Sequence, residues 1–203
     1  MKMMTRRFAL LGVALSLLSS CAALSAVDDA AVPLDAYALV PLPMAEPSPG
    51  GPHLVVEVPN STGALATDRI LIKPNPLQAT YLPDGRWIDP APVMMQSLLV
   101  NSLQNVARFS RVGRDGAGLI PDYTLITDLT AFEVDKAEIQ TVHVGVTITI
   151  IQESDRSILA TRRFDQTAPV AADSTPDVIR AFDAATTQLL SEAVDWVSGR
   201  VGG

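Results

Sequence analysis

The clearest hydrophobic pattern lies in the second half of the chain, where apolar and polar residues alternate. Residues 123–132 and 139–152 place apolar side chains at every second position, and the apolar face of the second run consists of Val142, Val144, Val146, Ile148 and Ile150. A period of two predicts strands with one face on a core and one more polar face. Ser154 to Ser157 predict a hairpin into a further strand over residues 158–166. The second half therefore begins with an antiparallel meander.

Two segments follow the helical period instead. The first opens at Asp89-Pro90-Ala91-Pro92 and ends near Arg108-Phe109; its predicted buried positions are Met95, Leu98, Leu99, Leu103 and Val106, and Gln96 falls off this stripe. The second begins with Thr175 as its predicted N-cap and ends at Gly199. Its apolar stripe is Val178, Phe182, Ala185, Leu189, Ala193 and Trp196.

The first half of the chain carries shorter signals. Short strands are predicted over residues 35–42, 53–58, 68–73, 77–82 and 110–113. Residues 41–52 hold five prolines and two glycines, which predicts a loop. Pro83-Asp84-Gly85 predicts a turn, and Pro74 and Pro76 indicate an edge strand or a bulge.

The order is strands, helix, strands in a meander, helix. This order predicts an α+β fold, with a largely antiparallel or mixed β-sheet and two main helices packed on one face.

The N-terminus has the composition of a secretory signal peptide. Lys2, Arg6 and Arg7 precede an apolar run over residues 8–18, which is shorter than the roughly 20 residues that a membrane-spanning helix needs. General secretion fits better than the twin-arginine route, because no basic residue follows the apolar run. The run ends in Leu18-Ser19-Ser20-Cys21, which resembles the lipobox of bacterial lipoproteins. The resemblance implies cleavage before Cys21 and lipidation of its thiol; the alternative is an ordinary cysteine near an ordinary cleavage site.

These features divide the chain into residues 1–20 as signal peptide, 21–35 as lipidated tether and 36–203 as a single domain. Cleavage removes three basic residues, so 12 Lys and Arg remain against 22 Asp and Glu, a net charge of about −10. An acidic balance argues against nucleic acid as a partner. With one cysteine in the chain, no internal disulfide can form.

Candidate chemistry is sparse. His53 and His143 lie on predicted strands with no second ligand at metal-binding spacing. Asp84 and Asp89 flank a turn, and the acidic residues of the predicted hairpin end match no metal-binding loop; these are Asp128, Glu133, Asp135 and Glu138. We therefore expect no catalytic residue, metal site or cofactor, and no enzymatic activity.

The most distinctive short sequence in the chain is Gly-Arg-Trp-Ile-Asp-Pro at residues 85–90. Arginine and tryptophan are enriched at the energetic centres of protein interfaces. Arg86 and Trp87, together with Arg69, are therefore candidate partner-contact or helix-start anchor residues. The alternative for Trp87 is a core residue that fixes the helix start to the sheet.

Several short runs carry a family resemblance beyond the lipobox: Tyr37-Ala38-Leu39, Val56 to Pro59, Asp68 to Leu71, Tyr81, Gly85 to Pro90 and Asp122 to Leu125. With this layout the chain resembles the auxiliary lipoprotein family of ABC-type transport systems, of the PqiC/YmbA type. The proline-rich loop at residues 41–52 departs from the family pattern.

The resemblance implies a periplasm-facing lipoprotein, anchored in the outer membrane through Cys21. It would act without enzymatic activity beside an MCE-domain protein and an ABC permease that move lipids or other hydrophobic molecules. Ala22 is consistent with the outer membrane, because it is not the Asp that retains lipoproteins in the inner membrane of enteric bacteria. The resemblance leaves open a homo-oligomeric ring docked on the MCE-domain protein.

Two alternatives stay open. One is a structural or assembly lipoprotein of another outer-membrane complex. The other is an envelope hydrolase, which would need a pocket with converging polar groups.

Overall fold

The computed structural model of the protein describes residues 34–46, 50–106 and 108–201, and Cys21 lies outside these ranges. Residues 35–203 form one compact unit. Its elements are β1 (Asp35–Tyr37), β2 (His53–Val56), β3 (Asn60–Ser61), β4 (Arg69–Asn75), β5 (Gln78–Trp87), α3 (Ala91–Asn105), β6 (Arg111–Arg114), β7 (Tyr123–Asp135), β8 (Thr141–Gln152), β9 (Ser157–Pro169) and α4 (Thr175–Val201).

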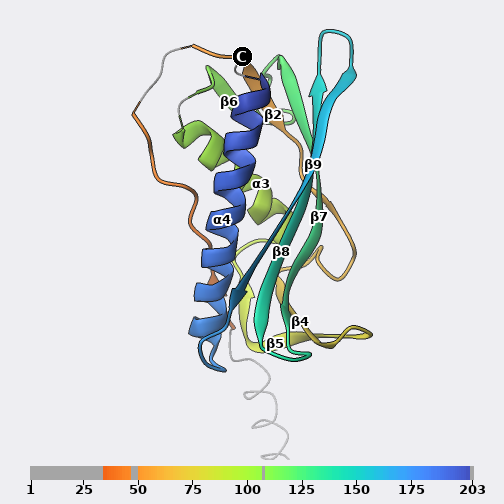
Figure 1. Ribbon diagram of the computed structural model, residues 1–203, viewed down its shortest axis with the longest axis vertical. Coiled ribbons are helices and arrows are strands. Elements are labelled where there is room, and N and C mark those ends of the chain that lie inside the picture. Colours follow the sequence, from red (N-terminus) through yellow and green to blue (C-terminus); the bar gives the residue numbers. More distant parts are fainter. Residues whose placement is uncertain (1–33, 47–49, 107, 202–203) are drawn as a thin grey trace, which may run out of the picture. The chain divides into compact units, whose positions relative to one another are not determined.

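Strand β7 is the centre of the sheet (Figure 1). Along one edge it pairs antiparallel with β8, which pairs antiparallel with β9. Along its other edge it pairs with β2, β3 and β4 in succession, each parallel to it. Strand β5 continues the sheet from β4, β1 from β5, and β6 from β2. The result is an α+β fold with a mixed sheet, as predicted.

The period-two alternation correctly predicted which residues of β8 face the core. Val142, Val144, Val146, Ile148 and Ile150 are all fully buried. On β7 the pattern holds only to Leu129, because a bulge shifts the register between Leu129 and Ala131. Ala131 then pairs with Gly145 on the opposite face, and Phe132 and Val134 enter the core. The alternation predicted over residues 123–132 is therefore wrong after Leu129, because a bulge leaves no mark in an apolar–polar pattern.

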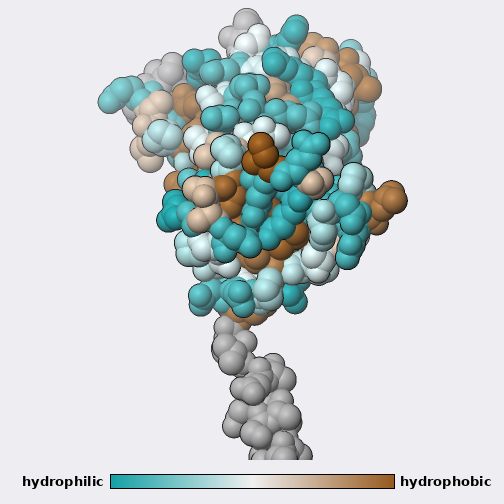
Figure 2. Space-filling view, turned by 60° about the horizontal axis from the view of Figure 1, so that its bottom comes forward, coloured by the Kyte–Doolittle hydropathy of each residue, from teal (hydrophilic) through white to brown (hydrophobic). Residues whose placement is uncertain are grey.

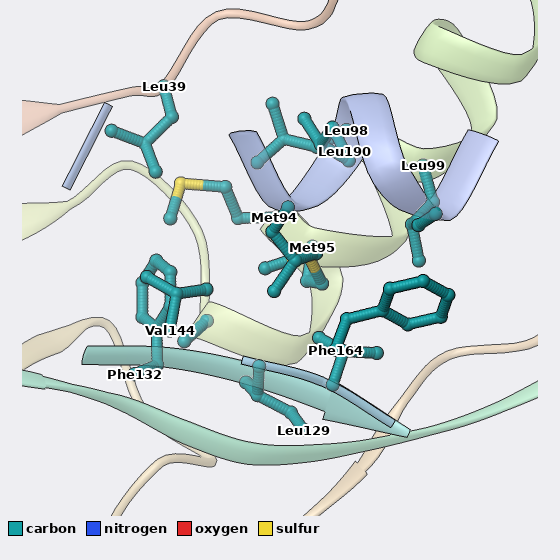
Figure 3. Close-up of a cluster of buried hydrophobic side chains, with 14 of the residues drawn as sticks. Leu39, Met94, Met95, Leu98, Leu99, Leu129, Phe132, Val144, Phe164 and Leu190 are labelled. Carbon is teal, nitrogen blue, oxygen red and sulfur yellow. The ribbon is translucent and has the colours of Figure 1, made fainter. Parts of the chain in front are cut away.

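Helices α3 and α4 cover the core face of the sheet (Figure 1). Figure 3 shows side chains of α3, among them Met94 and Leu98, gathered with Leu190 of α4 above Phe132 and Val144 of the sheet. All five side chains are buried. Burial of apolar surface between helices and sheet is the main stabilising term of such a layer fold.

Helix α3 is buried on more sides than its predicted stripe. Gln96, predicted to lie off the stripe, is 3% exposed and donates a hydrogen bond from Nε2 to the Val56 carbonyl at 2.9 Å. On another side the loop after β1 covers the helix, because the Leu42 amide donates to Ser102 Oγ and Asn105 Nδ2 donates to the Leu42 carbonyl. The helix ends at Asn105, earlier than predicted.

Helix α4 begins with a cap one residue before the predicted one. The Asp177 amide donates to Ser174 Oγ at 3.3 Å, and Ser174 Oγ in turn donates to the Asp177 carboxylate. Ser174 rather than Thr175 is therefore the N-cap. The helix continues through Gly199 to Val201.

The β4–β5 hairpin turns at Pro76-Leu77, where the Leu77 amide donates to Asn75 Oδ1 at 3.0 Å. The first strand is shorter than predicted and ends at Tyr37. Strand β5 runs on to Trp87, so the turn predicted at Pro83-Asp84-Gly85 lies inside a strand instead.

A candidate partner-contact site at a wide bulge

The Pro-Asp-Gly run forms a wide bulge in β5 rather than a turn. Arg69 pairs with Arg86, and Leu71 pairs with Tyr81. Between these two pairs lie one residue of β4 and four residues of β5. The three extra residues interrupt the ladder, which explains why turn-forming residues occur within a strand. Gly85 suits this position, because a Cβ there would lie 3.0 Å from both the Tyr37 ring and Thr175 Cγ2.

The bulge places two arginines directly opposite each other. Residues paired across a ladder project from the same face of the sheet, so Arg69 and Arg86 are neighbours. Arg86 Nη1 donates to Asp68 Oδ2 and to the Trp87 carbonyl, both at 3.3 Å. Arg69 Nη2 donates to the Leu82 carbonyl at 3.3 Å, and its guanidinium carbon lies 5.7 Å from the centre of the Tyr81 ring. The structure thus brings together two of the three residues predicted as partner contacts.

Trp87 is in the core. Its side chain is 0% exposed, and its ring centre lies 5.2 Å from that of Phe132 and 5.0 Å from that of Phe182. The tryptophan therefore joins β5 to β7 and α4, which matches its alternative interpretation as a core residue. Its backbone amide donates to the Asp68 carbonyl at 2.6 Å, which fixes the backbone beside Arg86.

The start of α3 and the residues before it are held by backbone contacts to the segment that precedes β4 and to β1. The Ala91 amide donates to the Thr67 carbonyl at 3.1 Å, and the Ile88 amide donates to the Tyr37 carbonyl at 2.8 Å. Residues 85–90 are thus held between the segment that contains Thr67 and the end of β1 at Tyr37.

A second polar cluster lies on the face of the sheet opposite the helices. Arg163 donates two hydrogen bonds to the Asp165 carboxylate, from Nε at 2.6 Å and from Nη2 at 2.7 Å. His143 Nε2 lies 3.1 Å from Asp165 Oδ1. The Arg163 hydrogen bond, assisted by His143, holds the pKa of Asp165 below its usual value. Sequence spacing could not find this cluster, because it depends on the β8–β9 register.

The acidic residues considered as a cation site have separate partners. Glu133 accepts from Lys73 Nζ at 2.7 Å, and Asp128 accepts from Asn60 Nδ2 at 3.2 Å. Within residues 34–46, 50–106 and 108–201, no group of three or more His, Cys, Asp or Glu residues is placed to hold a metal ion. In the same part of the chain, no helix has the length and apolarity to cross a bilayer.

The described surface has three hollows of note. They lie beside β6, at the β7–β8 turn and at the start of β7. The second is lined in part by Asp135, Glu138 and His143. Glu153, which lines the third hollow, accepts a hydrogen bond from the Thr124 hydroxyl at 2.6 Å.

Comparison with known proteins identifies one family. Residues 37–194 match the sequence model of the ABC-type transport auxiliary lipoprotein component. The uncharacterised protein bll6063 of Bradyrhizobium diazoefficiens is 26% identical over 157 residues, which cover 70% of this chain and 38% of that protein. This chain thus spans well under half the length of that relative.

Solved structures share the fold. Protein XCC0632 of Xanthomonas campestris superposes with a TM-score of 0.73 at 24% identity, over 82% of this chain and 94% of its own. The hypothetical protein CT253 of Chlamydia trachomatis gives a TM-score of 0.52 at 9% identity, over 73% of this chain and 98% of its own.

Proposed function

The chain belongs to the family of ABC-type transport auxiliary lipoprotein components, and we propose from this membership that it is a lipid-anchored adaptor of an envelope transporter. The observation that carries the proposal is the family match, which spans nearly all of the described unit. An auxiliary component works by contact with other proteins, and the paired arginines at the β5 bulge provide a candidate contact surface.

The adaptor's partners in this proposal are an MCE-domain protein and an ABC permease that move lipids or other hydrophobic solutes. The support is the resemblance to the PqiC/YmbA type, since the runs around Arg69 and Trp87 match that layout. A homo-oligomeric ring of this chain would present several copies of the contact surface to one partner.

In this proposal the adaptor is located on the periplasmic side of the outer membrane and is attached to it by a lipid on Cys21. The lipobox supports lipidation, and Ala22 after it supports sorting to the outer membrane. Two or more acyl chains would give a stable attachment, because a single chain holds a protein only weakly, with K on the order of 10⁴ M⁻¹.

Co-purification tests the proposal. The full-length chain with a C-terminal tag, expressed in its native cells and extracted in mild detergent, is expected to retain an MCE-domain protein identified by mass spectrometry. An unrelated tagged lipoprotein of the same cells is the control. Recovery of a different outer-membrane complex, with no MCE-domain protein, would instead support a structural or assembly lipoprotein.

A further inference from the structure

Strand β9 has a free edge along its length. Within the described residues it pairs with β8 alone, and no other hydrogen bond between main chains reaches residues 157–169. Figure 1 shows it at the rim of the sheet, beside α4. Every second residue of an edge strand turns its N–H and C=O away from the sheet. This edge is therefore a row of donors and acceptors with which a further strand can pair.

The edge is long, accessible and regular. The structure describes all 13 residues of the strand, and Phe164 is the one that is buried. Edge strands are usually short, or are interrupted by a proline or a bulge. In β9 the register with β8 is unbroken from Ala160 to Pro169, and this proline is the last residue of the strand. A partner strand can therefore align with most of its length.

The surface near the end of β9 favours a contact through the backbone. Figure 2 turns the lower end of Figure 1 toward the viewer, and hydrophilic residues cover most of this face, with hydrophobic groups between them. Strand addition takes its affinity from main-chain hydrogen bonds and its specificity from the side chains beside them. Such a contact does not require a large apolar patch.

The side chains of β9 fit a second copy of the same strand. Arg162 and Arg163 precede Phe164, and Asp165 and Gln166 follow it. If two copies pair antiparallel about Phe164, Arg163 of each copy lies opposite Asp165 of the other. Arg162 of each copy then lies opposite Gln166 of the other. Opposite charges directly across a ladder stabilise it.

On the open face of the sheet, this pairing forms a square of alternating charges. Arg163 already donates two hydrogen bonds to Asp165 of its own strand, at 2.6 and 2.7 Å. Across the new ladder each guanidinium would gain a second carboxylate, and each carboxylate a second guanidinium. The side chain of Arg163 is 58% exposed and that of Asp165 is 37% exposed, so both are accessible to a second copy.

On the helix side of the strand, the other arginine also meets a carboxylate. Arg162 pairs with Ile148, whose side chain is in the core, so both project toward the helices. No ion pair among the described residues involves Arg162, whose guanidinium carbon lies 4.8 Å from the centre of the Phe164 ring. Gln166 lies on the same side and donates from Nε2 to Glu192 of α4 at 2.6 Å. Opposite Gln166, the arginine of a second copy would therefore lie beside Glu192.

The neighbouring registers are unfavourable. Two identical edges related by a two-fold axis keep their helix faces on the same side of the joined sheet, so the axis passes through a residue position. An axis at Arg163 places two Arg163 side chains opposite each other, and an axis at Asp165 does the same to two carboxylates. An axis at Arg162 again opposes two arginines. Of these four positions, Phe164 alone pairs opposite charges, which specifies the register.

We infer that two copies of this chain pair antiparallel through β9, about a two-fold axis at Phe164. The sheet of one copy then continues into the sheet of the other. The inference goes beyond the proposed adaptor function and does not rest on it. A two-fold contact is closed, so a homo-oligomeric ring would need a second interface.

The pair is compatible with the proposed lipid anchor. Asp35 pairs with Gly85, where a Cβ would lie 3.0 Å from Thr175 at the start of α4. Antiparallel pairing places these ends of the two copies at opposite ends of the dimer. The 14 residues from Ala22 to Asp35 span up to about 50 Å, and the 13 residues of β9 span about 44 Å. Tethers of this reach let both copies attach to one membrane.

Cysteine cross-linking tests the inference. In this register Thr161 of one copy lies opposite Thr167 of the other, and Ala160 lies opposite Ala168. The double variants Thr161→Cys/Thr167→Cys and Ala160→Cys/Ala168→Cys are made in the full-length Cys21→Ala chain, which has no other cysteine. Within one chain the two members of each pair lie about 20 Å or more apart along the strand, too far for a disulfide.

Mild oxidation should link these chains into dimers on a non-reducing gel. Successive pairs across an antiparallel ladder alternate between close and wide, so at least one double variant should link in high yield. Each of the four single variants is a control, because its cysteine has no cysteine opposite. Failure of both double variants to link, or equal linking in the single variants, would overturn the inference.

Charge exchange tests the register. In analytical ultracentrifugation, the Cys21→Ala chain should show a concentration-dependent equilibrium between monomer and dimer. Arg163→Glu should weaken the dimer about tenfold or more, because like charges then face each other twice. Arg163→Asp/Asp165→Arg should restore it, since opposite charges again pair across the ladder. Arg156→Glu makes the same change in net charge in the β8–β9 turn, where the side chain is 80% exposed, and should leave the dimer unchanged.

The outcomes separate the dimer from other occupants of the edge. A Cys21→Ala chain that remains monomeric at all concentrations would leave the edge to a different partner and overturn the inference. An exchanged variant that is folded by circular dichroism yet monomeric would refute the register at Phe164. Neither experiment uses the transporter, so failure here leaves the proposed adaptor function standing, and failure of the co-purification leaves the dimer standing.

Discussion

At the scale of single residues, the described domain separates residues that hold the core from residues that offer chemistry to a partner. Trp87 and Arg86 are adjacent along β5, yet one is fully buried among aromatic rings and the other keeps 39% of its side chain exposed. Alternation along a strand produces this division. One residue can therefore be changed to test stability and its neighbour to test binding.

Removal of the buried tryptophan should cost much of the domain's stability. Trp87→Ala is expected to lower the free energy of unfolding by about 3–5 kcal/mol, since it leaves a cavity between Phe132 and Phe182. Urea unfolding followed by far-UV circular dichroism measures the loss. Trp196→Ala is the control, because Trp196 is only partly buried, against Phe164, and should cost less. Equal losses in both variants would contradict the central place of Trp87.

The Arg163–Asp165 pair predicts a pH dependence. The pKa of Asp165 is lower in the folded protein than the usual 3.8, so its contribution to stability is present above pH 3.8 and is lost as the pH falls through the lower folded value. Wild type should lose stability more steeply than Asp165→Asn when the pH is lowered from about 5 to about 2. Arg163→Gln should flatten the curve in the same sense. Parallel curves for wild type and Asp165→Asn would rule out this contribution.

At the scale of elements, long strands and the amphipathic helix could be predicted from sequence, and short parallel pairings could not. The β7–β8–β9 meander and α4 have long periodic runs, so their types were predicted correctly, as were the core faces of β8 and α4 and that of β7 up to its bulge. Strand β3 contains two residues and β2 four, too few for a period to show. Their neighbours are set by β7, which is distant along the chain.

The candidate site was only partly predictable for a related reason. Arg69, Arg86 and Trp87 could be selected by residue type, but their different surroundings follow from the β4–β5 register. Pro83-Asp84-Gly85 carries the same residues whether it closes a hairpin or forms a bulge. Only the pairing partners across the sheet decide between the two.

Gly145 of β8 pairs with Ala131 of β7 on one side and with Asp165 of β9 on the other, and there is no room for a side chain at this position. A Cβ there would lie 2.7 Å from Thr130 Oγ1 and 2.8 Å from Asp165 Oδ1. Gly145→Ala should therefore destabilise the domain by about 1–3 kcal/mol, as overpacking does. In an Asp165→Ala background the cost should be smaller, which a double-mutant cycle measures.

Gly199 in α4 is the matched glycine control. A Cβ at this position meets nothing within 4 Å, so Gly199→Ala should stabilise the helix by about 0.5–1 kcal/mol. A cycle at Gly145 with no coupling to Asp165 would show that another contact limits the space there.

At the scale of the whole molecule, the family match and the predicted lipidation site lie in different parts of the chain. Residues 37–194 carry the family match, whereas the predicted lipidation site Cys21 lies outside the described residues. The proposed anchoring and the proposed partner contact thus involve separate parts of the chain, so each can be removed alone.

Loss of the anchor should change location and leave the fold intact. Cys21→Ala is expected to move the protein from the membrane fraction to the soluble periplasmic fraction, because the thiol predicted to carry the lipid is gone. Cell fractionation with immunoblotting measures the shift, and Ser19→Ala, which keeps a small residue in the lipobox, is the control. A Cys21→Ala protein that still sediments with membranes would count against the lipid anchor.

Strand β7 has a consequence for the order of assembly. Strands β2, β3 and β4 lie end to end along one edge of β7 and do not pair with one another. Nothing aligns these three strands until residues 123–135 arrive, and a chain is synthesised from its N-terminus. Folding therefore waits on contacts distant in sequence, which slows it and prolongs the exposure of unpaired strands to aggregation. A chaperone that protects residues 53–75 during this interval would raise the yield of the native protein.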